Sequence, residues 1–147
     1  MELVTPAEAG IVFEVEEDGA TYLENARKKA DAGRRLSGLP TLADDSGLEV
    51  PRLGGKPGVH SARFAGPEHK GDGRALVRAL LEILGPAARE SPPASFHCSA
   101  VLVLPDGRIL AELSIEEKNL LSHRARALNA LEVHGAFDAA LLWEPPS

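Results

Sequence analysis

The feature that most constrains the fold is a short apolar run that ends at two adjacent carboxylates. Leu39, Leu42 and Ala43 predict a buried strand, and the sequence then reads Asp44-Asp45-Ser46-Gly47. Because Asp and Ser are poor strand residues and Gly permits a positive φ, we expect the strand to end at this point. In α/β folds the carboxyl ends of strands are where ligands bind.

Asp44 and Asp45 have two interpretations. No basic residue stands beside them, and a pair of carboxylates supplies the hard oxygen ligands that Mg²⁺ accepts together with substrate phosphates. The alternative is an Asx turn in which both side chains are solvated, since Asp and Gly mark turns generally. The tetrapeptide alone does not separate a metal site from a turn.

The composition indicates one globular domain, which we take as residues 1–147. With a net charge of −6 and no basic block, the chain is not expected to bind nucleic acid through its phosphate backbone. Cys98 is the only cysteine, so no internal disulfide is possible, which fits a reducing cytoplasm. We expect neither a signal peptide nor a membrane span.

Two amphipathic helices are predicted. A capping box of Thr21 and Glu24 opens the first, which we expect over residues 22–36. The second is expected over residues 74–84 and ends at Gly85-Pro86. Their apolar faces consist of Tyr22, Ala26 and Ala30 in the first helix and of Leu76, Val77, Leu80, Leu81 and Leu84 in the second.

Further strands are predicted on both sides of the second helix. Residues 48–50 predict a short strand, and residues 96–104 predict a long one that is half covered at first and then buried on both faces. Pro105-Asp106-Gly107 is a turn, after which residues 109–113 pair back as a hairpin. Ser114 to Glu117 matches a second capping box and predicts a short helix. A last helix is expected to begin at Ser122, with Leu128 and Leu131 on its apolar face.

Two loops carry candidate ligand groups. An acidic turn containing Glu16 and Glu17 precedes the first helix; on its own it favours a solvated loop, although its place in the chain can bring it near Asp45. The glycine-rich loop at residues 54–58 offers backbone N–H groups to an anion. Arg63 follows it and can pair with a phosphate or form an ordinary surface ion pair.

Four blocks of sequence occur in one order along the chain. They are Thr21-Tyr22-Leu23-Glu24-Asn25-Ala26 with Lys29-Ala30; Leu39-Pro40 with Leu42 to Val50; Pro57-Gly58-Val59 with Ser61-Ala62-Arg63; and Ala111-Glu112-Leu113-Ser114 with Glu117-Lys118-Asn119 and Ser122-His123-Arg124-Ala125. In this combination the chain resembles the inosine triphosphate pyrophosphatase family, whose members hydrolyse non-standard purine nucleoside triphosphates. The resemblance implies an α/β fold with a twisted mixed sheet flanked by helices, a nucleotide cleft between two lobes, and a cytoplasmic homodimer.

The resemblance also implies a catalytic centre. Asp45 would be the general base and a Mg²⁺ ligand, Ser46 would contact the substrate, and Glu16 or Glu17 would help to hold the metal. The implied reaction is attack of water at the phosphate chain of ITP, dITP or XTP, which gives the nucleoside monophosphate and pyrophosphate. A metal would offset phosphate charge, and a positioned carboxylate would deprotonate the water.

Recognition of the nucleotide is implied for Lys118, His123 and Arg124, with the last two near the purine. A donor from His123 or Arg124 aimed at the 6-position would accept a keto oxygen and disfavour the amino group of adenine, because two donors would then face each other. The same donor would not reject GTP, which also has a 6-keto group.

Two pieces of the family pattern have no counterpart in this sequence. One is a Thr/Ser-Gly-Asn…Lys loop that cradles phosphates, which the family has before the part matched by Met1 to Val4. The other is a Phe-Gly-Tyr-Asp-Pro segment between the Pro-Asp-Gly turn and Ala111. Three explanations stay open: the sequence omits segments that the molecule has, the chain is truncated, or it is a shortened relative that binds nucleotides without catalysis. We favour the first, because loss of an N-terminal strand would leave a sheet edge uncovered unless a partner subunit covered it.

Overall fold

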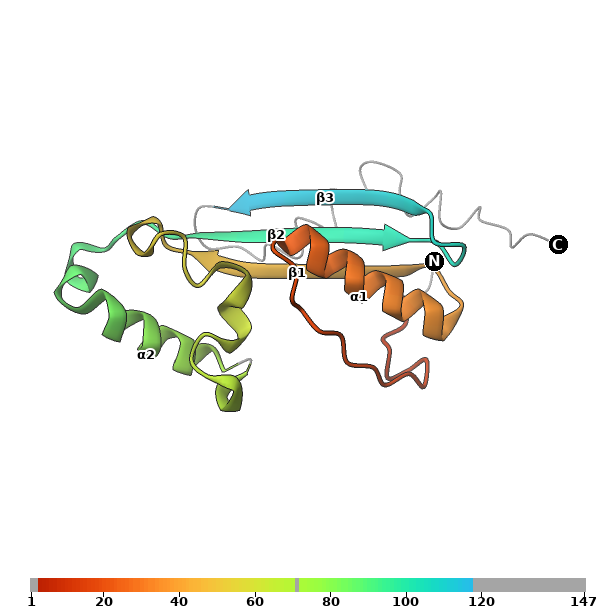
Figure 1. Ribbon diagram of the computed structural model, residues 1–147, viewed down its shortest axis with the longest axis horizontal. Helices are drawn as coiled ribbons and strands as arrows, with labels where there is room; N and C mark the ends of the chain where they lie inside the picture. Colours follow the sequence, from red (N-terminus) through yellow and green to blue (C-terminus); the bar gives the residue numbers. More distant parts are fainter. Residues whose placement is uncertain (1–2, 71, 118–147) are drawn as a thin grey trace. The chain divides into compact units, whose positions relative to one another are not determined.

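The computed structural model describes residues 3–70 and 72–117 (Figure 1). Within them the elements are α1 (Tyr22–Ser37), β1 (Thr41–Glu49), α2 (Gly73–Leu84), β2 (Ser95–Val103) and β3 (Ile109–Glu117), with short 3₁₀ turns between them. The strands form a sheet in the order β1-β2-β3, and the arrows in Figure 1 alternate in direction from each strand to the next. The last helix predicted from sequence, which would begin near Ser122, lies outside the described residues.

The chain divides into two compact units, as the expectation of two lobes requires. Of the described residues, the first unit contains those up to Asp45 and those from Cys98 to Ile115, and the second contains those from Ser46 to His97 with Glu116 and Glu117. One boundary falls within β1, between Asp45 and Ser46.

Helix α1 forms as its sequence predicts and covers the sheet in the first unit. Thr21 accepts a hydrogen bond from the N–H of Glu24 at 3.1 Å, and Gly38 ends the helix in the left-handed conformation with φ of 68°. The Glu24 carboxylate accepts from the N–H of Ala20 at 2.7 Å, one residue before the predicted partner. The core of the unit consists of Ala26, Ala30, Val101 and Val103, with Leu23 and Ala43 packed against them.

Strand β1 corrects the first expectation from sequence. It runs without a break from Thr41 to Glu49, so the two predicted strands on either side of Asp45 are one element. Gly47 is buried and does not adopt a positive φ. Asp45 is tolerated inside a strand because other side chains satisfy its carboxylate, which an isolated tetrapeptide cannot reveal.

The hairpin of β2 and β3 is confirmed, but its second strand is longer than predicted. The N–H of Leu104 donates to the carbonyl of Arg108 at 2.9 Å, and the N–H of Gly107 donates back to Leu104 at 2.9 Å. Strand β3 continues to Glu117, so the short helix predicted from Ser114 to Glu117 is wrong. Backbone pairing with β2 extends the strand through a sequence that also matches a capping box.

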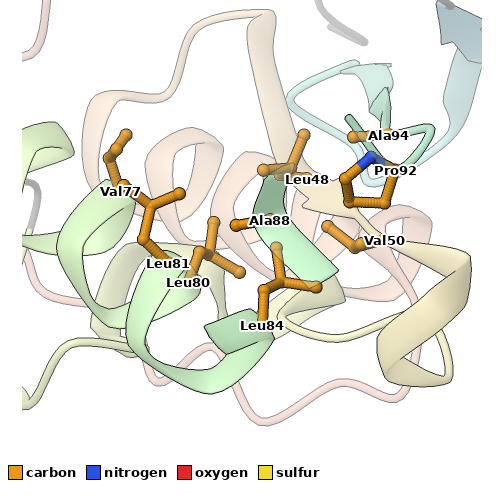
Figure 2. A pocket seen from close by; sticks show the side chains of 9 residues that line it. All are labelled: Leu48, Val50, Val77, Leu80, Leu81, Leu84, Ala88, Pro92 and Ala94. Atoms are coloured by element: carbon orange, nitrogen blue, oxygen red, sulfur yellow. The ribbon is translucent and has the colours of Figure 1, made fainter. Parts of the chain in front are cut away.

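The second unit is organised around α2. Asp72 caps this helix by accepting from the N–H groups of Arg74 and Ala75 at 2.9 and 3.2 Å. The predicted apolar face is only partly buried, since Leu80 is 6% exposed whereas Leu81 is 52% exposed. Side chains of this face, of Leu48 in β1 and of the segments that follow β1 and α2 line an open apolar pocket of about 210 Å³ (Figure 2): Leu48, Val50, Val77, Leu80, Leu81, Leu84, Ala88, Pro92 and Ala94.

Candidate active site

The candidate site is built around the carboxylate of Asp45, which is buried although it lies in the middle of β1. One oxygen, Oδ2, accepts from the amide Nδ2 of Asn25 at 3.1 Å. The other, Oδ1, accepts from the Nζ of Lys29 at 2.9 Å. Both partners come from α1, where a spacing of four residues puts them on one face of the helix. The carboxylate is therefore held at both oxygens by a single element.

Lys29 joins this carboxylate to a second one. Its Nζ also lies 3.0 Å from Oε1 of Glu17, so one ammonium group contacts two acids. Burial lowers the pKa of Lys29, but the hydrogen bonds and negative charges of Asp45 and Glu17 outweigh this effect, and its pKa is raised. Lys29 is thus held in its charged form. We call Glu17, Asn25, Lys29 and Asp45 the polar cluster.

The segment that carries Glu17 is fastened to the first turns of α1. The N–H of Gly19 donates to Oδ1 of Asn25 at 2.8 Å, and Asp18 forms an ion pair with Lys28. The N–H of Ala20 donates to Glu24, as described above. The acidic segment, which we define as residues 16–19, is therefore bonded to α1 through Glu17, Asp18 and Gly19, although Glu16 and Asp18 are exposed to solvent as its sequence favours.

The structure distinguishes the two glutamates offered as metal ligands. Glu16 is exposed, whereas Glu17 is half-buried and contacts Lys29. Both Glu17 and Asp45 present an oxygen within 3.0 Å of one point, the Lys29 ammonium, so the pair can also accept a small hard cation there. Among the residues that the structure describes, no group of three or more His, Cys, Asp or Glu side chains is placed to hold a metal ion. A Mg²⁺ ion fits this donor set, since it usually takes one or two carboxylates and fills its other positions with water and phosphate oxygens.

Asp44, the other acid of the pair, points to a different neighbour. Its Oδ2 lies 3.9 Å from the Sγ of the buried Cys98. No basic residue adjoins the two acids in the sequence, but Lys29, which is distant in sequence, contacts Asp45 in the structure. Ser46 follows Asp45 in β1 and is half-buried. The remaining predicted substrate residues, Lys118, His123 and Arg124, lie outside the described residues.

The glycine-rich loop at residues 54–58 is not the anion site that its sequence predicts. The N–H groups of Gly54, Gly55 and Lys56 donate to the carbonyls of Pro51, Val50 and Leu53. These donors are satisfied within the loop and are not directed at a ligand. The 3₁₀ turn Gly58–Arg63 that follows is joined to β1 through the buried Ser61, whose Oγ accepts from the N–H of Leu48 at 2.9 Å.

Sequence reasoning did not assign roles to Asn25 and Lys29, although both stand in matched blocks. Their signal is the spacing of four residues beside the small residues Ala26 and Ala30, which let a helix approach a sheet closely. A polar pair next to such a stripe lies at the border of the surface where the helix packs against the sheet. That pattern, read together with a strand bearing an acid, would have pointed to the polar cluster.

Two solved structures resemble this fold closely. The Staphylococcus aureus Ham1 protein aligns with a TM-score of 0.69 and 29% identity, over 86% of this chain and 82% of its own. A nucleoside-triphosphatase or dITP/XTP pyrophosphatase from Mycobacterium abscessus aligns with a TM-score of 0.63 and 30% identity, over 98% of this chain and 87% of its own. These likenesses confirm the α/β fold class.

The sequence comparisons identify the family. The family model described as the Ham1 family matches residues 1–110. The dITP/XTP pyrophosphatase of Syntrophobacter fumaroxidans is 41% identical, with 91% of this chain and 70% of that protein covered. The dITP/XTP pyrophosphatase of Geobacillus kaustophilus is 38% identical, with 81% of this chain and 74% of that protein covered. This chain belongs to the Ham1 family, and the resemblance read from its sequence is confirmed.

The alignments also show that these relatives are longer within the matched region. They extend over 165 and 154 residues, although this chain has 147 residues and is covered only in part. The relatives therefore carry residues inside the matched region that have no counterpart here. Residues missing from this chain within the matched region were also expected from its sequence.

Proposed function

We propose that this protein hydrolyses non-standard purine nucleoside triphosphates, namely dITP, XTP and ITP, to the nucleoside monophosphate and pyrophosphate. The observation that carries the proposal is the polar cluster, in which a half-buried and a buried carboxylate share one ammonium group in a chain of the Ham1 family. The relatives named dITP/XTP pyrophosphatase support the substrate class. Removal of such nucleotides from the nucleotide pool is the corresponding role.

Asp45 acts as the general base. Its carboxylate takes a proton from the attacking water as the new bond from oxygen to phosphorus forms, and the bond between the α- and β-phosphates breaks so that pyrophosphate leaves. The contacts of Asn25 and Lys29 hold the carboxylate in one orientation, as proton transfer requires. A base placed in this way contributes about 10²–10⁴-fold to the rate.

Mg²⁺ is the proposed cofactor, held by Asp45 and by Glu17 in preference to the exposed Glu16. When bound, the metal offsets phosphate charge and polarises a phosphoryl oxygen. Lys29 contacts the same two acids, so its ammonium competes with the metal for them. The remaining ligands would be water and oxygens of the substrate.

The other contacts to the nucleotide are proposed from the resemblance. Ser46 adjoins the base in β1 and contacts the substrate. Lys118, His123 and Arg124 hold the nucleotide, with the last two near the purine, where His123 or Arg124 donates a hydrogen bond to the 6-keto oxygen. These donors disfavour adenine, because its 6-amino group would meet a second donor.

We propose further that the protein acts in the cytoplasm as a homodimer. No helix of the described part of the chain is long and apolar enough to cross a membrane. The net charge of −6 does not favour binding to nucleic acid. The nucleotide is therefore the proposed partner besides a second copy of the chain, and sedimentation of the purified protein tests the dimer.

The test of the activity is pyrophosphate release from dITP, XTP, ITP, GTP and ATP, with Mg²⁺ and with the metal removed by a chelator. We expect release from the first three nucleotides, little from ATP, and none without metal. A folded protein that releases pyrophosphate from no nucleotide would overturn the proposal. It would favour the second candidate, a nucleotide-binding relative without catalysis, for which the residues missing inside the matched region are the supporting observation.

A further inference from the structure

We infer that Asn25 is a positioning residue that fixes the Asp45 carboxylate relative to the acidic segment. This inference rests on the proposed function, since it concerns the same site. Asn25 itself needs no contact with the substrate. It acts through the two groups that its amide bonds, the carboxylate of Asp45 and the backbone of Gly19.

The amide of Asn25 has only one orientation that satisfies both neighbours. Its Oδ1 accepts from the N–H of Gly19 at 2.8 Å, and its Nδ2 donates to Oδ2 of Asp45 at 3.1 Å. A rotation of the amide by half a turn would place a donor against the Gly19 N–H and an acceptor against the carboxylate. The side chain therefore links one specific backbone atom of the acidic segment to one specific oxygen of the base.

Burial makes this link hard to replace. Asn25 is 0% exposed, so water cannot substitute for either partner at the side chain itself. The acidic segment also approaches the amide very closely, since a Cβ atom at Gly19 would lie 2.6 Å from Oδ1 of Asn25 and 2.9 Å from Cβ of Glu24. Only glycine allows the N–H of residue 19 to reach this position without moving the amide.

The link matters because Glu17 and Asp45 must act together. They reach the same ammonium group from different elements, the acidic segment and β1. Lys29 binds one oxygen of Asp45 through its ammonium, whereas the Asn25 amide binds the other oxygen and is bonded to the backbone of Gly19 as well. If the amide were lost, Asp45 would keep a charged partner but lose the contact that sets its rotation and the position of residues 17–19.

The experiment compares four variants with the unchanged protein. Asn25→Ala removes both contacts, and Asn25→Asp keeps an acceptor for Gly19 but removes the donor to Asp45. Gly19→Ala disturbs the amide from the other side. Thr21→Ala removes a hydrogen bond from the same end of α1 without touching the cluster and serves as the matched control.

Four quantities are measured for each variant: kcat and KM for dITP with Mg²⁺, the Kd for Mn²⁺ alone by electron paramagnetic resonance, and the folded fraction by urea denaturation. For Asn25→Ala we expect kcat to fall and the Mn²⁺ Kd to rise, each by about 10–100-fold, as for other residues that orient metal-binding groups. Asn25→Asp and Gly19→Ala should lower kcat by at least tenfold, with KM for dITP changed less. Thr21→Ala should leave kcat and the Mn²⁺ Kd within about twofold once the folded fraction is taken into account.

Two results would overturn the inference. One is a folded Asn25→Ala variant whose kcat and Mn²⁺ Kd both stay within twofold of the unchanged protein. The other is a loss of activity that simply follows the folded fraction, equally in Asn25→Ala and Thr21→Ala, which would make Asn25 a structural residue only. If the unchanged protein itself hydrolyses no nucleotide, the proposed function fails instead, and the Mn²⁺ affinities still decide the role of Asn25.

Discussion

Different kinds of contact stabilise the polar cluster of the first unit and the apolar pocket of the second unit. In the cluster each contact joins one named atom to another, from Gly19 N through Asn25 and Asp45 to Lys29 and Glu17. In the pocket the lining side chains present only apolar carbon atoms, whose contacts have no preferred direction (Figure 2). Directional bonds lose most of their value when atoms shift by a fraction of an ångström, whereas apolar contact decreases in proportion to area.

This difference predicts where substitutions act. A change in the polar cluster should alter turnover more than the free energy of unfolding. A change in the pocket should alter the free energy of unfolding and leave the turnover of each folded molecule intact.

The largest effect is expected for Asp45→Asn. The amide has nearly the shape of the carboxylate but cannot take a proton from water, so kcat should fall by about 10²–10⁴-fold. Pyrophosphate release from dITP measures the rate, and circular dichroism with urea denaturation shows whether the fold is kept. A folded variant within tenfold of the unchanged protein would remove Asp45 from the role of base.

Leu80→Ala should produce the largest change in stability. Leu80 is 6% exposed, and truncating a buried leucine lowers the free energy of unfolding by about 2–5 kcal/mol. The kcat of the molecules that remain folded should not change. Leu81→Ala is the matched control, because this neighbour in the same pocket is 52% exposed and should cost only about 1 kcal/mol. Equal losses in the two variants would show that the pocket is not packed as described.

Lys29→Met should change both the free energy of unfolding and the stabilisation that Mn²⁺ provides. It keeps the length of the side chain but leaves Glu17 and Asp45 without their shared ammonium, so the free energy of unfolding should fall by about 1–3 kcal/mol. Mn²⁺ should then stabilise the variant more than the unchanged protein, since the cation no longer competes with a fixed positive charge. Urea denaturation with and without Mn²⁺ measures this; equal stabilisation of both proteins would mean that metal and ammonium do not share a place.

The smallest effect is expected for Glu112→Gln in β3. Two hydrogen bonds from Arg27 lower the pKa of Glu112, with a further contribution from the Arg27 charge, although slight burial opposes the shift. A lowered pKa stabilises the folded state above the unfolded value of about 4.3, and this contribution is lost as pH falls through the folded pKa. The variant should therefore be slightly less stable at neutral pH, and the difference should narrow as the solution is acidified. A difference in urea midpoint that grows toward low pH would contradict the assignment.

Local sequence signals predicted the elements that depend on local contacts. The cap at Thr21 and the stripe of Ala26 and Ala30 define α1, and the apolar run from Cys98 to Leu104 defines most of β2. The turn at Asp106 and Gly107 closes the hairpin through contacts within five residues. Each of these features is formed by residues close together in the sequence, so it can be recognised without knowing any distant partner.

The predictions of secondary structure were wrong where a residue or strand distant in sequence determines the local conformation. Asp45 stays inside β1 because Asn25, 20 residues earlier in the chain, bonds its carboxylate. Ser114 to Glu117 stay extended because β3 pairs with β2, although the same residues can cap a helix. For the site, Asp45 was predicted together with Glu16 or Glu17, but Asn25 and Lys29 were not assigned roles. An Asn and a Lys on a helix are ordinary residues until the sheet that the helix packs against is known.

The tight turn between β2 and β3 has a practical consequence for protein engineering. It joins the strands through Pro105, Asp106 and Gly107, and the carbonyl of Pro105 accepts a hydrogen bond from Arg34 of α1 at 3.1 Å. The family pattern has its aromatic segment just after this turn. Because the entropy of closing a loop grows slowly, by about 0.6 kcal/mol for each doubling of length, a longer loop can be spliced in here at small cost. A chimera carrying the corresponding loop of a longer relative would therefore measure, on one scaffold, how much nucleotide affinity that loop supplies.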